Sequence, residues 1–283
     1  MMNRRSGQHL LWVLTVLLWI PTVQAADKTP VKILLIATKT DHPWGSHMYM
    51  FDSQVLASCL NQMPGVEARV SLDWPKDPKM LAGVKSIVCF SRPGGEMVLD
   101  PGRRPQFEKL MKEGVGYVAI HWATGIGYSK FAEDPAIREA YKNILGGWFR
   151  RPPCGVKVDQ SRLVQVDKKH PICRGWQDYD LRDEFYLDLV FHEKAKPLIR
   201  AKIDDKQQVV AWAFNRPGSR DGRSFGTTMG HFHSNFVLPS HRRFMVNAIL
   251  WTAHVDIPAG GAPVEVKAKD LKLPPMPVEK ESK

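Results

Sequence analysis

The sequence predicts an α/β fold built on a mostly parallel β-sheet. Residues 31–37 form an almost continuous apolar segment, which is typical of a strand buried on both faces, and residues 86–90 and 116–120 are also of strand length and largely apolar. Segments with helical spacing separate these strands, and such alternation favours βαβ units. Ligands of open parallel sheets bind beyond the carboxyl ends of the strands, so these ends are where a site is expected.

In the first half of the chain, turn signals separate the expected elements. Pro64-Gly65 ends a helix, and Arg92-Pro93-Gly94-Gly95 ends a strand. The expected elements are, in chain order, a strand at 31–37, a helix at 46–61, strands at 66–72 and 86–90, a helix at 104–113 and a strand at 116–120.

The second half is less regular. The segment 215–222 is rich in turn-forming residues and would join two strands as a pair, while the last helix carries an apolar stripe that includes Phe244 and Ile249. The expected elements are a loop at 146–153, strands at 156–166, 183–191, 209–214 and 223–229, and a helix at 240–254. We therefore expect one domain at 31–257 and a tail at 258–283 that is extended along the surface or disordered.

The first 25 residues have the pattern of a secretory signal peptide. Arg4 and Arg5 precede an apolar segment at 10–20, and Pro21 and the small residue Ala25 follow it. The apolar segment is shorter than the roughly 20 residues that a transmembrane helix needs. We expect a mature chain that begins near Ala26, is periplasmic or secreted, and has no membrane span after cleavage.

Composition argues against a nucleic-acid partner and against a metal site built from cysteines. The formal charge is +11, but the lysines and arginines are scattered, so a solvated basic surface is the interpretation and no nucleic-acid partner is expected. The four cysteines include no C-x-x-C pair, which argues against a thiolate zinc site. Export would permit a disulfide between Cys154 and Cys173. The sequence does not indicate an oligomeric state.

Histidines follow three of the predicted strands. His42 and His47 come after the first strand, His121 follows the fourth strand directly, and His231 and His233 follow the strand at 223–229. In an extended segment, His231 and His233 would point to the same side, with Phe232 toward the core. Each of these side chains has a structural alternative, because a histidine can also cap a helix or bond a loop carbonyl.

Other polar and aromatic residues are expected at the same edge of the sheet. Glu184 lies beside Asp183 in a predicted strand and is the candidate carboxylate, while Asp41 could orient His42. The backbone N–H groups of a glycine pair could bind an oxyanion, and aromatic rings could stack on a sugar or pack in the core. The candidate substrate-binding residues are His42, Trp44, His47, Gly94, Gly95, Trp122, Tyr186 and His233.

Several enzyme classes are disfavoured because their motifs are missing from the sequence. No Walker or dinucleotide-binding fingerprint occurs, and no G-x-S-x-G elbow is present. The chain is therefore not expected to be a P-loop nucleotide-binding protein, a dinucleotide-dependent enzyme or a serine hydrolase.

Taken in order, several motifs resemble those of the ThuA-like (trehalose-utilisation) family over residues 31–257. They are Gly114-Val115-Gly116-Tyr117-Val118-Ala119-Ile120-His121-Trp122-Ala123-Thr124, His170-Pro171-Ile172, Asp183-Glu184-Phe185-Tyr186, Gly222-Arg223-Ser224-Phe225-Gly226 with Gly230-His231, and Ala248-Ile249-Leu250-Trp251. The resemblance implies the fold of class I glutamine amidotransferases, a flavodoxin-like sheet with helices on both faces.

The resemblance also bears on the chemistry of the site. In those amidotransferases a nucleophilic cysteine follows a central strand, whereas His121 stands at the matching turn here; His231 is kept, and His233 stands where a glutamate would fall. Without the thiolate an acyl-enzyme cannot form, so amidotransferase activity is not expected. Many relatives also carry a histidine after the turn at 146–149, where this chain has Arg150.

The family association implies a small carbohydrate, such as a ketosugar or disaccharide, as substrate. Two mechanisms are compatible with the residues. His121 and His231 could act as general base and acid tuned by Glu184, as in a sugar isomerase, lyase or hydrolase. Alternatively, a divalent metal such as zinc could be held by His42, His121 and His231, with His47 and Glu184 as further ligands. The competing interpretation is a non-catalytic sugar-binding protein on an inherited enzyme scaffold.

Overall fold

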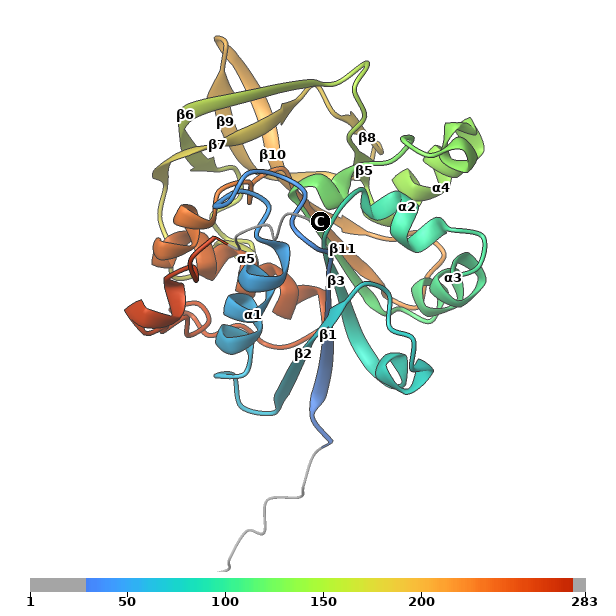
Figure 1. Cartoon of the computed structure of the whole chain (residues 1–283), viewed down its shortest axis with the longest axis horizontal. Helices are drawn as coiled ribbons and strands as arrows, with labels where there is room; N and C mark the ends of the chain where they lie inside the picture. Colours follow the sequence, from blue (N-terminus) through green and yellow to red (C-terminus); the bar gives the residue numbers. More distant parts are fainter. Residues whose placement is uncertain (1–28, 277–283) are drawn as a thin grey trace, which may run out of the picture.

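The structure, a computed structural model, describes residues 29–276. The predicted signal peptide and the last seven residues of the predicted tail lie outside this range. A nine-stranded mixed sheet runs through the molecule, and helices cover both faces of its parallel half (Figure 1).

Five neighbouring parallel strands form the half of the sheet that carries the predicted edge. In spatial order they are β2 (Val66–Leu72), β1 (Val31–Ala37), β3 (Val84–Phe90), β4 (Gly116–Ile120) and β11 (Arg223–Thr227). This order, with the last strand of the chain taking the fifth place, is the flavodoxin-like arrangement. It confirms the predicted α/β fold class.

The other half of the sheet is antiparallel. It continues from β11 through β10 (Lys206–Asn215), β9 (Lys196–Ile203), β6 (Gly155–Gln165) and β7 (Tyr179–Leu187). The predicted pair of strands at 209–214 and 223–229 corresponds to β10 and β11, which are antiparallel neighbours. A separate two-stranded sheet joins β5 (Gly147–Trp148), inside the predicted loop, to β8 (Val190–Phe191).

Two hydrophobic cores lie on opposite faces of the parallel strands because their side chains alternate. Ile33 and Leu35 of β1 belong to one core, and Leu34 and Ile36 belong to the other. The first core packs against α1 (Tyr49–Leu60) and α5 (Pro239–Thr252). The second packs against α2 (Gly94–Leu99), α3 (Arg104–Lys112) and α4 (Pro135–Leu145) (Figure 1).

The cysteines do not form the suggested disulfide. All four are buried and unpaired; Cys154 packs with Phe149 and Tyr186, whereas Cys173 belongs to the core beneath α5. Because the two thiols lie in different hydrophobic clusters, the suggested pairing of Cys154 with Cys173 is wrong.

The segment that follows Ile257 packs against the helices over its described part. Ala262 and Val264 are buried, and the guanidinium group of Arg242 on α5 donates to the carbonyl oxygen of Val264. A short 3-10 turn, η6 (Ala268–Leu271), follows. Among the helices of residues 29–276, none combines the length and apolar character needed to cross a membrane.

Candidate metal centre

His47 comes from the loop after β1 and is held by a carboxylate. Its Nδ1 lies 2.8 Å from Asp41 Oδ1 and 2.6 Å from the hydroxyl of Tyr49. Since a carboxylate accepts hydrogen bonds, Nδ1 of the neutral ring carries the hydrogen and Nε2 carries a free lone pair. The ring is 1% exposed, and its Nε2 points toward the ends of β4 and β11.

His121 directly follows β4 and begins the 3-10 turn η2 (His121–Thr124). Its Nδ1 donates to the backbone carbonyl of Thr228, at 2.6 Å. A carbonyl oxygen can only accept, so the neutral His121 ring also carries its lone pair on Nε2. The side chain is completely buried.

Asp183 positions the other two side chains. Its carboxylate accepts hydrogen bonds from the backbone N–H of Gly230 (2.8 Å) and of His231 (3.0 Å), which fixes the loop after β11 against β7. Glu184, the next residue of β7, points to the opposite side, as strand alternation requires. There its Oε2 lies 3.5 Å from Nδ1 of His231.

The loops that carry His47 and His231 are also joined through the backbone. The N–H of His47 donates to the carbonyl of His231 (2.9 Å), and the N–H of His233 donates to the carbonyl of Gly45 (2.9 Å). The side chains of these loops are therefore fixed by main-chain bonds as well as by their own contacts.

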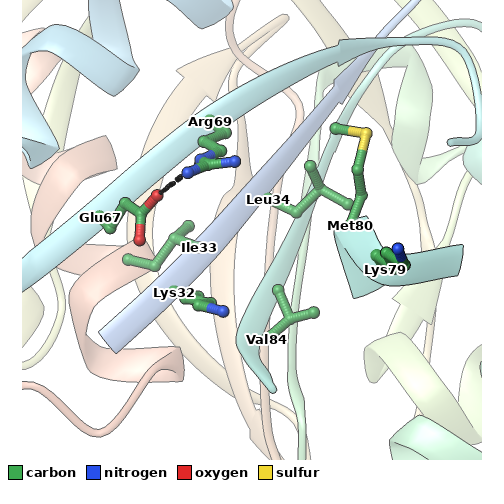
Figure 2. A pocket seen from close by; sticks show the side chains of 8 residues that line it. All are labelled: Lys32, Ile33, Leu34, Glu67, Arg69, Lys79, Met80 and Val84. Atoms are coloured by element: carbon green, nitrogen blue, oxygen red, sulfur yellow. Dashed lines mark hydrogen bonds and ion pairs between the residues drawn. The ribbon is translucent and has the colours of Figure 1, made fainter. Parts of the chain in front are cut away.

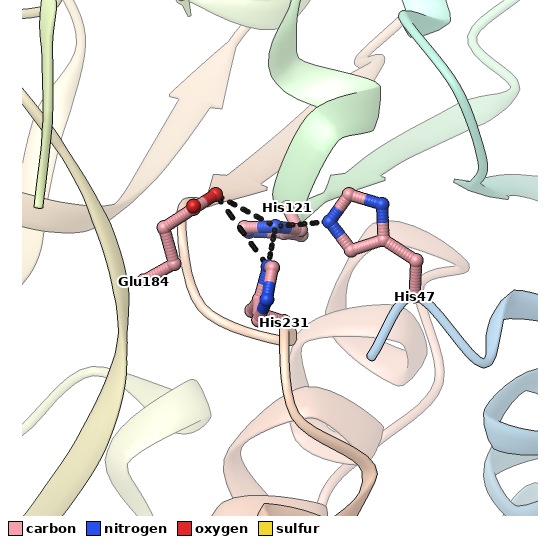
Figure 3. Close-up of side chains that lie close together, drawn as sticks. All are labelled: His47, His121, Glu184 and His231. Carbon is pink, nitrogen blue, oxygen red and sulfur yellow. Dashed lines mark hydrogen bonds and ion pairs between the residues drawn. The ribbon is translucent and has the colours of Figure 1, made fainter. Parts of the chain in front are cut away.

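The four side chains His47, His121, Glu184 and His231 form a compact group, which we call the candidate centre (Figure 3). Nε2 of His121 lies 3.0 Å from Nε2 of His47, 3.2 Å from Nδ1 of His231 and 3.5 Å from Oε2 of Glu184. One nitrogen or oxygen from each residue lies within 4.8 Å of all the others. The hydroxyl of Tyr186 lies 3.1 Å from the same His121 nitrogen.

These separations match the ligand spacing of a small divalent cation. Zinc binds imidazole nitrogen and carboxylate oxygen at about 2.0–2.2 Å, so ligand atoms at tetrahedral corners lie about 3.3 Å apart. The four short contacts within the candidate centre run from 3.0 to 3.5 Å. Three histidines and a carboxylate are also ligands that zinc and related cations accept.

Burial keeps two of the imidazoles neutral, and the contact with His231 keeps Glu184 ionised, which are the protonation states that metal ligands need. Burial, and then the charges of His47 and His231, hold the pKa of His121 well below 6.5, and burial likewise lowers the pKa of His47. For Glu184 burial alone would raise the pKa, but the hydrogen bond and charge of His231 outweigh it and lower the pKa below 4.5. Two neutral imidazoles and an ionised carboxylate therefore face one point.

The structure places the predicted site residues in different ways. It brings together His121, His231 and Glu184, which were predicted to be catalytic, and adds His47, which was predicted as a substrate-binding residue and as a further metal ligand. His42, predicted as a metal ligand, lies outside these four residues, but with Asp41, which its Nδ1 contacts at 3.0 Å, and His47 it forms a second group whose ligand atoms lie within 4.8 Å of one another. Its ring is exposed, and the ring centroid lies 3.6 Å from that of His47.

Two predicted aromatic residues lie at the candidate centre and one does not touch it. Tyr186 contacts His121 and stacks on Phe149, with ring centroids 3.8 Å apart. Trp122 is half-buried, and its ring centroid lies 5.7 Å from that of His47. Trp44 is half-buried, and within the described chain its ring makes no contact with the histidine rings.

His233 has a structural role instead of the predicted substrate-binding one. His231 and His233 flank Phe232, which forms an isolated antiparallel bridge with Ser46 and is half-buried under Arg182, but their rings contact different groups. The ring of His233 bonds Asp52 on α1 (2.6 Å) and the carbonyl of Leu271 (2.7 Å). It therefore joins α1 to the C-terminal segment.

Gly94 and Gly95 also serve packing and not the predicted binding of an oxyanion. The N–H of Gly95 already donates to the carbonyl of Gly125 (3.0 Å). A Cβ added at Gly94 would lie 2.2 Å from the carbonyl oxygen of Ala123, and one at Gly95 would lie 2.5 Å from the side chain of Ile126. The glycines thus allow α2 to approach η2.

Sequence reasoning missed three positioning groups. It predicted that Asp41 orients His42 alone, although the carboxylate also bonds His47. It did not predict that Asp183 positions the loop after β11. Strand alternation was a usable signal for Asp183, because adjacent residues of a strand face opposite sides. The carbonyl of Thr228 left no sequence signal, since any residue offers the same acceptor.

A hollow near the amino end of β1 is a poor alternative site (Figure 2). It measures about 100 Å³, whereas pockets for small ligands are roughly 300–1,000 Å³. Two of its charged side chains, Glu67 and Arg69, pair with each other. It also lies at the opposite strand ends from the histidines, so the candidate centre remains the site of interest.

Fold and site together define a flavodoxin-like α/β protein with a His₃Glu cluster at the carboxyl ends of its parallel strands. Residues 33–252 match the family model ThuA, described as trehalose utilisation. The chain therefore belongs to the ThuA family, which confirms the resemblance of its motifs and associates it with carbohydrate utilisation. A search of curated proteins finds no match.

Solved structures share the fold at low sequence identity. A protein described as ThuA-like from Bacteroides uniformis is 19% identical with a TM-score of 0.59, and the match covers 84% of this chain and 97% of that one. A protein described as cytoplasmic from Salmonella typhimurium is 16% identical with a TM-score of 0.56, over 78% of this chain and 99% of that one. At these identities the likeness shows the fold alone.

Proposed function

We propose that this chain is an exported carbohydrate-processing protein that binds one divalent cation, with zinc as the first candidate. His47, His121, His231 and Glu184 are the proposed ligands. Membership of the ThuA family supports the carbohydrate, and the signal-like first 25 residues support export. The geometry of the candidate centre supports the cation.

One observation carries the proposal: the lone pairs of two neutral imidazoles face each other. The Nδ1 hydrogens of His47 and His121 are directed to Asp41 and to the carbonyl of Thr228, so both Nε2 atoms present lone pairs at a separation of 3.0 Å. The carboxylate of Glu184 adds a further acceptor 3.5 Å away. Two such acceptors repel each other unless a donor or a cation lies between them, and a cation bound by both nitrogens and by Glu184 would use these lone pairs together.

The surrounding residues suit metal-assisted sugar chemistry. A cation held there would supply a Lewis acid that polarises a sugar oxygen or a water molecule. Glu184 is half-buried, so its carboxylate can contact a bound substrate, and the buried Tyr186 directs its hydroxyl to the same point. His121 is completely buried, which favours a role as ligand over direct proton transfer to a sugar.

Metal analysis of purified protein tests the cation. After chelation, repletion with zinc, manganese or cobalt and dialysis, we expect one equivalent of one of these metals per chain. His47→Ala and His121→Ala should lose it, since each removes a ligand. His42→Ala is the matched control, because His42 shares Asp41 but lies outside the candidate centre, and it should keep the metal. A wild-type protein that stays metal-free after repletion contradicts the proposal.

Turnover separates processing of a carbohydrate from binding alone. The metal-loaded protein should convert at least one member of a panel of ketosugars and glycosides, and His121→Ala should abolish the conversion. Saturable binding without turnover of any member would favour the non-catalytic sugar-binding protein instead.

A further inference from the structure

One face of β7 leads outward from the candidate centre to an arginine. Strand alternation places the side chains of Arg182 and Glu184 on one side of β7, whereas Asp183 and Phe185 are buried on the other. Glu184 reaches the candidate centre (Figure 3), and Arg182 is about 7 Å farther along the strand. Glu184 is half-buried and Arg182 is exposed. The side chain of Arg182 therefore lies at the open end of the face that carries Glu184.

Contacts through Phe232 show how close Arg182 is to the histidines. Its guanidinium carbon lies 4.8 Å from the centroid of the Phe232 ring, and this centroid lies 4.5 Å from that of the His231 ring. A single aromatic side chain thus separates the guanidinium group from a proposed metal ligand. One substituted sugar ring is long enough to contact both.

The guanidinium group of Arg182 is free to bind a ligand. Within the described chain it takes part in no ion pair and donates no hydrogen bond, and its charge contacts only the face of Phe232. Asp180, the other charged residue at that end of β7, faces Arg162 on β6 at 3.4 Å. Glu184 is turned away to the histidines. No acidic side chain of the described residues therefore neutralises Arg182.

Neighbouring side chains of β6 complete a surface that a sugar ring can contact. In the antiparallel register Val158 pairs with Glu184 and Gln160 pairs with Arg182, so all four side chains lie on one face. Val158 is 41% exposed although it is apolar, and Gln160 is exposed as well. Val158 can contact the C–H groups of a sugar, and the amide of Gln160 can both donate to and accept from its hydroxyls.

The charge on this face selects for an anionic substituent. A guanidinium group presents N–H donors in a planar fork that matches two oxygens of one carboxylate or sulfate group. Hydrogen bonds between charged partners are stronger than those between neutral ones, so a neutral hydroxyl at the same place would gain less. A cationic substituent would be repelled.

We infer that Arg182 binds an anionic substituent of the sugar that contacts the candidate centre. The substrate class is then an acidic sugar, with a carboxylate or sulfate group at Arg182 and its ring beside Val158 and Gln160. This inference rests on the proposed function, since it takes the candidate centre as the place of the reacting sugar.

Calorimetric titration of the metal-loaded full chain with matched neutral and acidic sugars tests the inference. Glucose is compared with glucuronate and glucose 6-sulfate, and galactose is compared with galacturonate. At least one acidic sugar should bind about tenfold more tightly than its neutral partner, because it adds a charge-assisted contact with Arg182. A preference limited to the uronates identifies a carboxylate as the anionic group, and one limited to the sulfated sugar identifies a sulfate ester.

Variants assign the preference to the guanidinium group. Arg182→Gln removes the charge and should abolish the preference, while the affinity for the neutral sugar and the metal content stay unchanged. Arg182→Lys keeps the charge without the planar fork and should retain part of the preference. Arg200→Gln is the matched control, because Arg200 is an exposed arginine of β9 without an ion pair in the described chain, and it should keep the full preference. Added salt should weaken the preference, since it depends on an exposed charge.

The outcomes separate this inference from the proposed function. Equal affinity for every acidic sugar and its neutral partner, no binding of any sugar in the panel, or a preference that survives Arg182→Gln would overturn the inference. Circular dichroism identifies a folding failure of Arg182→Gln, and the salt dependence and Arg182→Lys then decide. Wild-type protein that binds the metal but shows no acid preference would keep the proposed cation and reject the role of Arg182. An acid preference that depends on Arg182 in protein that takes up no metal would do the reverse.

Discussion

Two side chains of the candidate centre lie on backbone that L-residues adopt rarely. His47 has φ of 50° and His121 has φ of 55°, both in the left-handed region. Such conformations cost on the order of 1–3 kcal/mol each and persist where the surroundings fix them. Here the hydrogen bonds to Asp41 and to the carbonyl of Thr228 fix the two rings. The conformational strain therefore lies at two of the residues that we propose as ligands.

A histidine outside the candidate centre gives a prediction for stability against pH. His241 is completely buried on α5, and burial lowers its pKa from 6.5 to about 3. Between these pH values the unfolded chain binds a proton that the folded chain does not. Its contribution is therefore complete above pH 6.5 and falls as the pH decreases, by up to about 1.4 kcal/mol per pH unit.

Urea unfolding of wild-type protein and His241→Phe between pH 7 and pH 5 measures this effect. The wild type should lose about 2 kcal/mol more than the variant over that interval. His192→Phe, at a residue outside the buried core, controls for loss of a histidine as such. Equal pH slopes for wild type and His241→Phe would show that the buried imidazole is not the cause.

At the scale of single residues, position in the chain predicted part of the candidate centre. His121 and His231 were identified because each follows a strand of a parallel sheet, and such ends converge. The sequence prediction placed His42 ahead of His47 as a metal ligand, although both lie in one loop whose side-chain directions follow no period. The left-handed φ of His47 and its bond to Asp41 decide between them in three dimensions.

Among the elements, α2 and η2 set the position of the turn that carries His121. Gly94→Ala would put a Cβ 2.2 Å from the carbonyl oxygen of Ala123 and 2.8 Å from the hydroxyl of Tyr141. We expect this overpacking to lower the free energy of unfolding by about 1–3 kcal/mol, as measured in urea. Because Ala123 lies in η2 two residues after His121, metal affinity should fall as well.

Gly260→Ala is the matched control for that change. The added Cβ would meet nothing within 4 Å, and the backbone there is not left-handed. Its effect should stay within about 0.5 kcal/mol, the usual range for a surface substitution. A similar loss in both variants would show that the contact of α2 with η2 is not the cause.

Sequence reasoning overlooked the helix α4 and the strand β9, and only α4 carried a usable signal. For α4, Asp134 accepts from the N–H of Ala136 as an N-cap, Pro135 takes the first helical position and Gly146 ends the helix with φ of 84°. By contrast, β9 is an antiparallel strand whose pairing depends on distant partners. Its neighbours β10 and β6 are fixed only by the tertiary fold, so local pattern did not single it out.

For the molecule as a whole, the C-terminal segment contributes to the first core. A chain truncated after Ile257 would lose the buried Val264, and with it the carbonyl that accepts from two nitrogens of the Arg242 guanidinium group. We expect a loss of about 2–4 kcal/mol in the free energy of unfolding, from one apolar side chain and the hydrogen bonds to a buried charge. Urea unfolding measures it.

Truncation after Lys272 is the control, because it keeps Val264 and also the carbonyl of Leu271 that His233 contacts. It should unfold at the urea concentration of the full chain. If the chain that ends at Ile257 were as stable as this control, the segment would lie on the core without stabilising it.

The overall architecture was predictable in the parallel half of the sheet, where strand and helix alternate along the chain. It was less predictable in the antiparallel half, where they do not. The strand at 116–120 coincides with β4, which is completely buried and continuously apolar, and the strand at 66–72 coincides with the edge strand β2, in which apolar and polar residues alternate. The antiparallel half, from β10 to β7, contains half-exposed strands such as β6. Their apolar pattern is weaker, and it does not reveal the order of these strands in the sheet.

The wide spacing of the candidate ligands along the chain has a consequence for biosynthesis. They stand at positions 47, 121, 184 and 231, so an N-terminal fragment lacks a complete cluster until β11 and the loop after it have been made. A chain translocated unfolded would therefore reach its destination without the ion. The metal supply that matters would be that of the receiving compartment, not that of the cytosol where translation takes place.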